Sequence, residues 1–171
     1  GNLMTLIASV TVSGAAGAEK SKALQSDQTV QITTQAAAQK TEVTLGKADG
    51  FALKSVKMAA DFSTNATSSS QDITDRYEFD SGQRDAFYDL ARIKLKPGRP
   101  APTGRLLVTF DFFTHGAGDY FSVDSYDGVV TYEQIPTFIS PDGDGDAYDL
   151  RDCLDFRPRV DDNGVNFTSS G

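Results

Sequence analysis

The sequence predicts a mainly β protein, an antiparallel sandwich with an extended N-terminal arm and a short C-terminal helical turn. About seven short segments alternate apolar and polar residues, as half-buried strands do. Gly, Pro and Asp turns separate these segments. Hydrophobic residues make up 39% and charged residues 23% of the 171 residues, which is typical of a globular domain. An immunoglobulin-like topology fits these strands, although the chain has no Trp and one Cys and therefore lacks the Cys…Trp…Cys signature.

The first part of the chain, residues 1–41, is expected to be an arm or linker with short strands. An N-terminal strand at 8–12 is preferred to a signal peptide, because nothing basic precedes Leu3. Residues 13–41 are rich in Ala, Ser, Thr, Gln and Gly, so they bury little apolar surface. Within them only residues 29–33 alternate like a strand.

Residues 42–160 are expected to form the sandwich domain, and residues 161–171 a tail or a linker to the rest of a longer chain. Two strands within 42–62 flank an Asp-Gly turn at 47–50. The apolar phase then shifts by one residue after Ser55, which indicates a β-bulge. The alternative for the second of these strands is a helix, because apolar residues also recur three and four apart.

Strand signals are densest in the second half of the chain. Residues 77–79 and 91–95 read as short strands, the second with strict alternation of apolar and basic residues. Residues 106–113 predict a central strand, because one face of that strand is fully apolar. Further strands are expected at 121–123 and 129–132.

Two short helical segments complete the expected elements. A brief helix is predicted between residues 81 and 91, where apolar side chains lie four apart. A single helical turn is predicted over 150–154, with Leu150 and Leu154 facing the core together. Cys153 in this turn is expected to be buried as a small hydrophobe.

Charge and composition exclude several functions. The chain carries 16 Lys and Arg against 24 Asp and Glu, for a net charge of −8, which disfavours a nucleic-acid binder. The apolar stretch 3–12 is about half of what a membrane helix needs. One Cys and one His exclude an internal disulfide and most Cys- or His-based metal sites. No nucleic-acid partner, membrane contact or cofactor is therefore expected.

One acidic loop is a candidate calcium site. Asp142, Asp144 and Asp146 alternate with glycines, and carboxylates at this spacing can surround a hard cation. The full EF-hand pattern fails, because Ala147 stands where Gly is needed and Cys153 where Glu is needed. The alternative is a solvated hairpin tip, for which Asp and Gly are ordinary residues.

Catalytic readings are weaker than structural ones, and no catalytic residue is predicted. His115 would be the base of any Ser-His-Asp triad, but the sequence has no Gly-x-Ser-x-Gly elbow. The alternative for His115 is a turn residue that hydrogen-bonds the backbone.

A glycosidase would need two carboxylates, for which Asp111 with Asp119 or Asp124 are the candidates. The alternative for Asp111 is a hydrogen-bonded strand residue paired with Arg84 or Arg105.

A set of polar residues around the predicted helical segments is expected to brace the fold or to contact a partner chain, and the sequence leaves both roles open. Exposed ion pairs contribute about 0–1 kcal/mol each, so their use would be to fix geometry or to select a partner. The residues are Gln83, Arg84, Asp85, Arg151, Asp152, Arg157 and Arg159.

Several strings of the second half, taken together, resemble one domain family. They are DITDRY at 72–77, DSGQRDAFYD at 80–89, RLLVTFDFFTH at 105–115, GDYFSVDSY at 118–126, IPTF at 135–138 and YDLRDCLDFRPR at 148–159. This region, about half the chain, resembles an uncharacterised domain of large virion structural proteins of tailed, cyanophage-like bacteriophages.

The resemblance implies a non-enzymatic segment of a tail, baseplate or fibre-attachment protein, located in the virion tail. It implies other tail or baseplate proteins as partners, and a homo-oligomer. Extended arms and edge strands suit such assembly. The alternatives are a host-surface glycan-binding or depolymerising tail-fibre domain and a calcium-stabilised adhesin.

Overall fold

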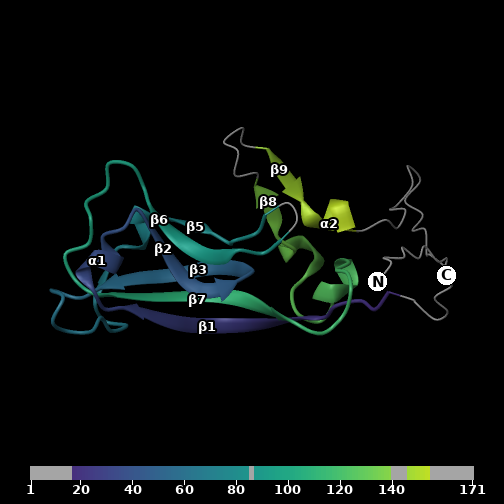
Figure 1. Ribbon diagram of the computed structural model, residues 1–171, viewed down its shortest axis with the longest axis horizontal. Coiled ribbons are helices and arrows are strands. Elements are labelled where there is room, and N and C mark those ends of the chain that lie inside the picture. Colours follow the sequence, from purple (N-terminus) through teal and green to yellow (C-terminus); the bar gives the residue numbers. More distant parts are fainter. Residues whose placement is uncertain (1–16, 85–86, 140–145, 155–171) are drawn as a thin grey trace, which may run out of the picture.

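Two antiparallel β-sheets lie one above the other, and a two-stranded hairpin stands beside the upper sheet (Figure 1). The computed structural model describes residues 17–84, 87–139 and 146–154. The mainly β, antiparallel fold class predicted from the sequence is therefore confirmed, and the immunoglobulin-like topology stays a prediction. No helix within the described ranges is long and apolar enough to cross a membrane.

The first sheet has the order β1-β7-β3-β4, the second the order β2-β6-β5, and β8 pairs with β9. The strands are β1 (Lys22–Ile32), β2 (Glu42–Ala48), β3 (Gly50–Met58), β4 (Gln71–Asp72), β5 (Tyr77–Asp80), β6 (Leu90–Leu95), β7 (Leu106–His115), β8 (Thr137–Ile139) and β9 (Ala147–Asp149). The helices are α1 (Gln35–Ala38) and α2 (Leu150–Leu154), and the 3₁₀ turns are η1 (Thr74–Arg76), η2 (Val123–Tyr126) and η3 (Tyr132–Gln134).

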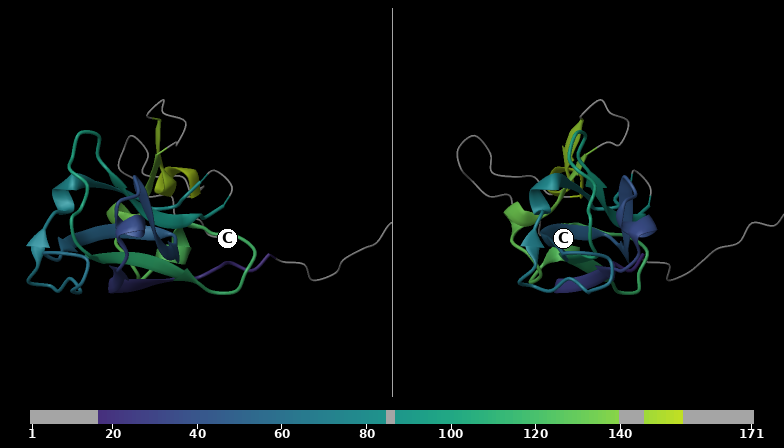
Figure 2. Two further views of the ribbon diagram at one scale, coloured as in Figure 1. Left: turned by 60° about the vertical axis from the view of Figure 1, so that its left-hand side comes forward. Right: turned by 90° about the vertical axis from the view of Figure 1, so that its left-hand side faces the viewer.

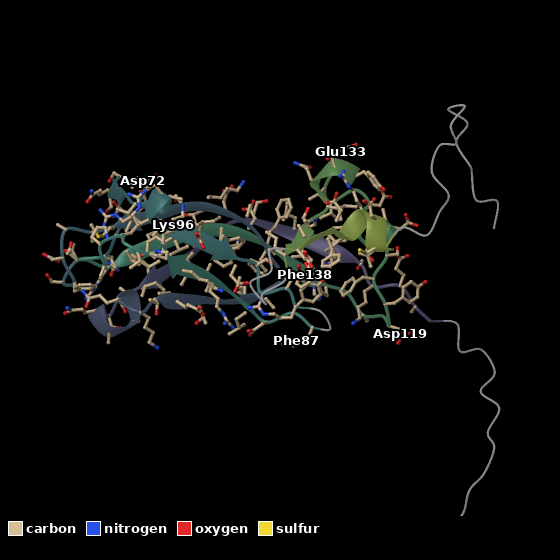
Figure 3. All side chains as sticks on the ribbon, turned by 90° about the horizontal axis from the view of Figure 1, so that it is seen from above. Asp72, Phe87, Lys96, Asp119, Glu133 and Phe138 are labelled. Carbon is tan, nitrogen blue, oxygen red and sulfur yellow. The ribbon has the colours of Figure 1, made fainter. Side chains whose placement is uncertain are left out.

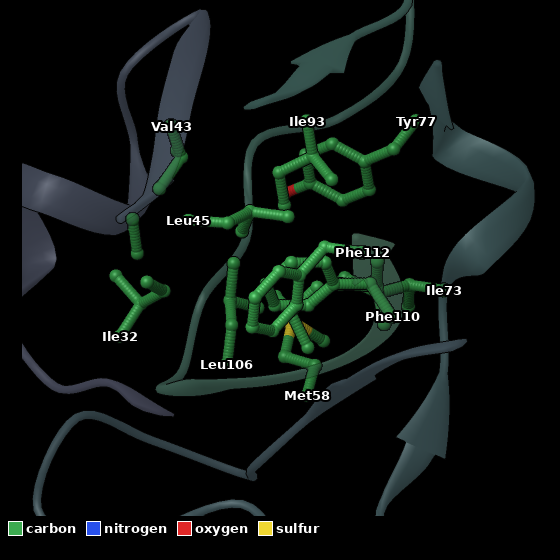
Figure 4. Close-up of a cluster of buried hydrophobic side chains, with 13 residues drawn as sticks. Ile32, Val43, Leu45, Met58, Ile73, Tyr77, Ile93, Leu106, Phe110 and Phe112 are labelled. Atoms are coloured by element: carbon green, nitrogen blue, oxygen red, sulfur yellow. The ribbon is translucent and has the colours of Figure 1, made fainter. Parts of the chain in front are cut away.

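The main core fills the space between the two sheets (Figure 4). β7 lies centrally between β1 and β3, as predicted, and its even-numbered residues face this core. The rings of Phe110 and Phe112 pack 5.8 Å apart at its centre. The buried members are Ile32, Ala38, Val43, Leu45, Val56, Met58, Ile73, Tyr77, Ile93, Leu106, Val108, Phe110 and Phe112.

A second, smaller core covers the other face of β7 near its end. Phe113 packs there against Tyr126 of η2, with ring centroids 5.5 Å apart in an edge-on arrangement. Val123 and Ile135 complete the buried set, and both leucines of α2 pack against it. The predicted helical turn at 150–154 is thus confirmed, whereas Cys153 is exposed rather than buried, because it lies on the outer side of that turn.

Bulges allow single strands to serve both cores. The register of β1 against β7 shifts between Gln25 and Gln28, so the first residues of β1 share a face with Phe113 and the last share a face with Val108. β3 shifts register twice against β7 between Gly50 and Ser55. The predicted bulge in β3 is therefore confirmed, and the helical alternative for this segment is wrong.

β2 and β3 are consecutive strands that belong to different sheets. Asp49 separates them with a left-handed φ of 52°, and the chain passes there from the second sheet to the first. The Asp-Gly signal correctly marks the end of one strand and the start of the next. It does not make a hairpin, because β2 pairs with β6 and β3 pairs with β7.

Three other segments differ from the sequence prediction. The expected arm includes Lys22–Ile32, which forms β1 and pairs along its length with β7; few apolar residues suffice because β1 is an edge strand. Residues 81–84 and 87–89 form no helix, and a bridge between Gln83 and Tyr88 closes this loop. The strands expected at 121–123 and 129–132 are replaced by the turns η2 and η3, because Ser122 and Thr131 form capping boxes. The strand expected at 8–12 lies outside the described residues.

Candidate functional site

A lysine is buried at the end of the first sheet where β1 begins and β7 ends. The side chain of Lys22 has no exposed surface, and that of Asp49 is 4% exposed. Lys22 Nζ lies 2.5 Å from Asp49 Oδ2. Asp49 reaches this position from the β2–β3 junction, where its backbone carbonyl accepts the Phe113 amide at 2.9 Å. β1, β7 and the β2–β3 junction therefore converge on one ion pair.

Aromatic rings enclose the Lys22 ammonium. Its nitrogen lies 4.7 Å from the ring centroids of Tyr88, Phe121 and Tyr126, and 5.1 Å from that of Phe113. Such contacts stabilise a cation through the negative ring faces. Burial nevertheless lowers the pKa of Lys22, and the Asp49 carboxylate opposes part of that shift.

His115 meets the same carboxylate oxygen. Its Nε2 lies 2.5 Å from Asp49 Oδ2, and its ring packs at 4.8 Å from Phe121 and 5.1 Å from Tyr88. The Lys22 ammonium also donates to the Tyr88 hydroxyl at 3.1 Å. The side chain of His115 is 27% exposed, so this residue connects the buried pair to the surface.

The arrangement joins an amine, a carboxyl group and an imidazole around one oxygen atom. We call Lys22, Asp49, Tyr88 and His115 the lysine cluster. Removing one partner of a buried ion pair costs about 3–5 kcal/mol, because it leaves the other charge uncompensated. The cluster therefore holds β1 to the β2–β3 junction.

Sequence reasoning missed this cluster. His115 was expected to hydrogen-bond the backbone, whereas its described partner is the Asp49 side chain. The sequence predicts an arm at Lys22 and a turn at Asp49, and the two residues lie 27 positions apart. The available signal was a lone histidine at the end of an apolar strand, which identifies one member and not its partners.

Two of the predicted polar residues support the loop that carries Tyr88. Gln83 forms a bridge with Tyr88, and the Arg84 amide donates to the Phe87 carbonyl at 2.9 Å. The Arg84 guanidinium donates to both oxygens of Asp80 at 3.0 Å. These contacts are internal to the chain.

Of the other predicted polar and metal-ligating residues, the structure describes only some. Arg151 donates to Asp149 at 2.8 Å and lies 5.8 Å from the Tyr132 ring, and Asp152 is exposed. Asp146 is exposed, and no group of three metal-ligating side chains occurs in residues 17–84, 87–139 and 146–154. The remaining predicted residues lie outside the described part of the chain, namely Asp85, Asp142, Asp144, Arg157 and Arg159.

Asp111 is a buried strand residue with partners other than the arginines expected. It accepts the Asp27 amide at 2.8 Å and pairs with Lys54 at 3.0 Å. Arg84 binds Asp80, and Arg105 donates to Phe62 and Asn65. Asp111 has these partners because the bulges in β1 and β3 bring Asp27 and Lys54 next to β7 from its two sides.

A groove of about 440 Å³ separates the second sheet from the β8–β9 hairpin. Phe51, Phe79 and Phe138 supply its aromatic surface. Its charged residues are Glu78, Asp80, Arg84 and Lys94. Burial raises the pKa of Asp80, but hydrogen bonds from Arg84, the Gly82 amide and Lys94 outweigh burial and lower it to about 2.

Comparisons of the chain with protein-family models, with curated proteins and with solved structures found no match.

Proposed function

We propose that this chain is a non-enzymatic structural segment of a virion, a tail, baseplate or fibre-attachment component that acts through subunit assembly. Its partners are other tail or baseplate proteins and further copies of itself. The motif resemblance over residues 72–159 supports the assignment of the chain to a virion. The surface of the fold supports subunit assembly as the way in which the chain acts.

The observation that carries the proposal is an exposed apolar hairpin. Ile139 of β8 is 65% exposed and Tyr148 of β9 is 49% exposed. The hairpin stands clear of the sandwich on the side away from β1 in every view (Figures 1 and 2). Large apolar side chains on a projecting element are typical of surfaces that another chain covers.

The burial of the ion pair in the lysine cluster also favours a structural role. Both members of its ion pair are buried, so a substrate in solution would not reach them. Two of the three carboxylates considered for a glycosidase bind partners within the chain. Asp111 binds Lys54, and Asp119 accepts the Ala18 amide at 2.8 Å.

The test replaces the exposed apolar residues of the hairpin. Virions assembled with an Ile139→Ser, Tyr148→Ser double variant should incorporate much less of the chain than virions with the wild type. Tyr120→Ser is the matched control, because Tyr120 is 50% exposed but lies in the loop after β7. Circular dichroism checks that both variants fold. Equal incorporation of all three chains would contradict the proposal.

A second candidate function is the binding of a surface glycan in the groove beside β8. Aromatic rings next to charged hydrogen-bonding groups are suited to sugar rings and hydroxyls. Hydrolysis is less well supported, since a glycosidase acid needs a raised pKa and the pKa of Asp80 is lowered. Phe138, labelled in Figure 3, is the residue to test. Phe138→Ala should abolish signals on a glycan array if this reading holds, and an array without wild-type signals would exclude it.

A further inference from the structure

We propose that Lys22 and Asp49 join in an amide bond between their side chains, with His115 as the acid–base group. The bond would link β1 to the β2–β3 junction within one chain. This modification does not depend on the assembly function proposed above, and its test does not require a partner.

The reacting atoms already lie within reach. Lys22 Nζ lies 2.5 Å from Asp49 Oδ2, and a carbon–oxygen bond is about 1.2 Å long, so the carboxyl carbon lies within about 3.7 Å of the nitrogen. Near-attack distances for such reactions are about 3–3.5 Å. Both side chains enter from rigid backbone, since Lys22 pairs with His115 across the sheet and Asp49 accepts the Phe113 amide. Little movement separates the ion pair from an attack geometry.

The surroundings of Lys22 favour the neutral, reactive form of its amine. Amide formation needs an uncharged amine and a protonated carboxylic acid, which arise when one proton moves from Nζ to the carboxylate. Burial lowers the pKa of Lys22, although the Asp49 carboxylate and the surrounding ring faces oppose part of that shift. The same burial limits the access of bulk water, which would otherwise reverse the reaction.

The step balances without any further reactant. The Nζ lone pair attacks the Asp49 carboxyl carbon, and the imidazole of His115 takes a proton from the nitrogen. His115 Nε2, 2.5 Å from Oδ2, then returns a proton to that oxygen. The bond between the carbon and Oδ2 breaks, one water molecule leaves, and Oδ1 remains as the amide oxygen. No group is oxidised or reduced.

The bond would alter the mechanical behaviour of β1. This strand lies at a sheet edge and pairs with β7 alone. Its first residue would become covalently attached to another part of the fold, which closes the segment between residues 22 and 49 into a loop. Such closure restricts the unfolded chain, as other covalent cross-links do. A strand held in this way would not peel from β7 under load.

The first test is the intact mass of the purified, folded wild-type chain. We expect a mass one water molecule below that of the sequence, and a branched peptide that contains Lys22 and Asp49 after proteolysis. Trypsin should not cleave after Lys22, because an acylated lysine is not a substrate. A folded chain at the full sequence mass would overturn the proposal.

A succinimide at Asp49–Gly50 would remove the same mass, so a variant must distinguish the two. Lys22→Arg keeps the positive charge but lacks the amine. It should have the full sequence mass, and water loss that persists in this variant would indicate the succinimide and overturn the proposal. If Lys22→Arg fails to fold, the branched peptide from the wild type distinguishes the amide bond from the succinimide by itself.

The role of His115 is tested through the rate at which the amide bond forms rather than through its final yield. During cell-free synthesis, the fraction of chain that lacks one water is followed over time for the wild type and for His115→Gln. General acid–base groups typically contribute about 10²–10⁴-fold, so we expect a slowing of at least about a hundredfold. Equal rates in two folded proteins would remove His115 from the step.

Discussion

Asp49 and Asp111 are buried carboxylates that connect strands at single residues. Asp49 contacts Lys22 from β1 and His115 from β7, and Asp111 accepts the amide of Asp27 in the β1 bulge. Each therefore replaces backbone pairing where the regular ladder is interrupted. Buried polar groups are retained at low cost when every one of them has a partner.

Asp111→Ala should destabilise the fold more than loss of its ion pair alone. The substitution also removes the hydrogen bond from the Asp27 amide to the buried Asp111 carboxylate, and a bond to a charged group contributes about 1.5–3 kcal/mol. Lys54→Met is the matched control, because it removes the ion pair of a half-exposed lysine and keeps the hydrogen bond from the Asp27 amide. Urea unfolding measures both. Equal losses would show that the bulge does not depend on Asp111.

Tyr77→Phe should leave stability unchanged or raise it. The Tyr77 hydroxyl is buried in the main core and has no hydrogen-bond partner among the described residues. Removing it relieves a desolvation cost on the order of 1 kcal/mol. Tyr88→Phe is the contrasting variant, because it removes the oxygen that accepts from Lys22. Thermal unfolding of the two variants should therefore differ in sign, and a large loss for Tyr77→Phe would contradict the account.

Asp80 should make the fold sensitive to acid. Its pKa is about 2 in the folded chain against 3.8 for the free group, because its bonds to Arg84, Gly82 and Lys94 outweigh burial. The carboxylate therefore contributes stability above about pH 4, on the order of 2 kcal/mol, and loses it as the pH falls toward 2. Asp80→Asn should flatten this part of the stability profile. Asp75→Asn, whose carboxylate is 67% exposed, should leave it unchanged.

At the scale of elements, the loop between β5 and β6 depends on one glycine. Gly82 has a φ of 81°, and a Cβ added at this position would overlap the backbone oxygen of Asp89. The Gly82 carbonyl in turn accepts the Asp89 amide at 2.6 Å. This close approach fixes the loop that presents Tyr88 to Lys22.

Gly82→Ala should thus cost more than backbone strain alone. Gly98→Ala is the matched control, because Gly98 has a φ of 78° but nothing lies within 4 Å of its added Cβ. A left-handed conformation costs a residue with a side chain about 1–2 kcal/mol, which is the loss expected for Gly98→Ala. Gly82→Ala should exceed it and should also alter the Tyr88 environment in near-UV circular dichroism. Equal costs would contradict the close packing of this loop.

The strands that the sequence predicts well are those with an uninterrupted period. β6 alternates apolar and basic residues and one face of β7 is apolar throughout, so the positions of both strands and the central place of β7 follow from the pattern. The pattern does not predict β1, because the bulge at Gln25–Gln28 breaks the alternation and the exposed edge needs few apolar residues. The pattern predicts strands where η2 and η3 form, because capping by Ser122 and Thr131 outweighs the β-propensity of the residues beside them.

At the scale of the whole molecule, two cores share β7, and the smaller core meets the lysine cluster near the end of that strand. The composition and alternation predict the layers, because burial of apolar faces is a local pattern repeated along the chain. They do not predict the cluster, since Lys22, Asp49 and His115 come together through bulges and a change of sheet. The polar residues near Tyr88 were found because they precede a strand at a turn, where such side chains are conspicuous in a sequence.

The most direct test of the assembly account is cross-linking mass spectrometry on virions that contain this chain, with a lysine-reactive reagent. Lys94 lines the groove beside the exposed hairpin, and its side chain is 39% exposed. The account predicts cross-links from Lys94 to neighbouring tail or baseplate subunits or to a second copy of the chain. Absence of the chain from purified virions, or links confined within single chains, would contradict it.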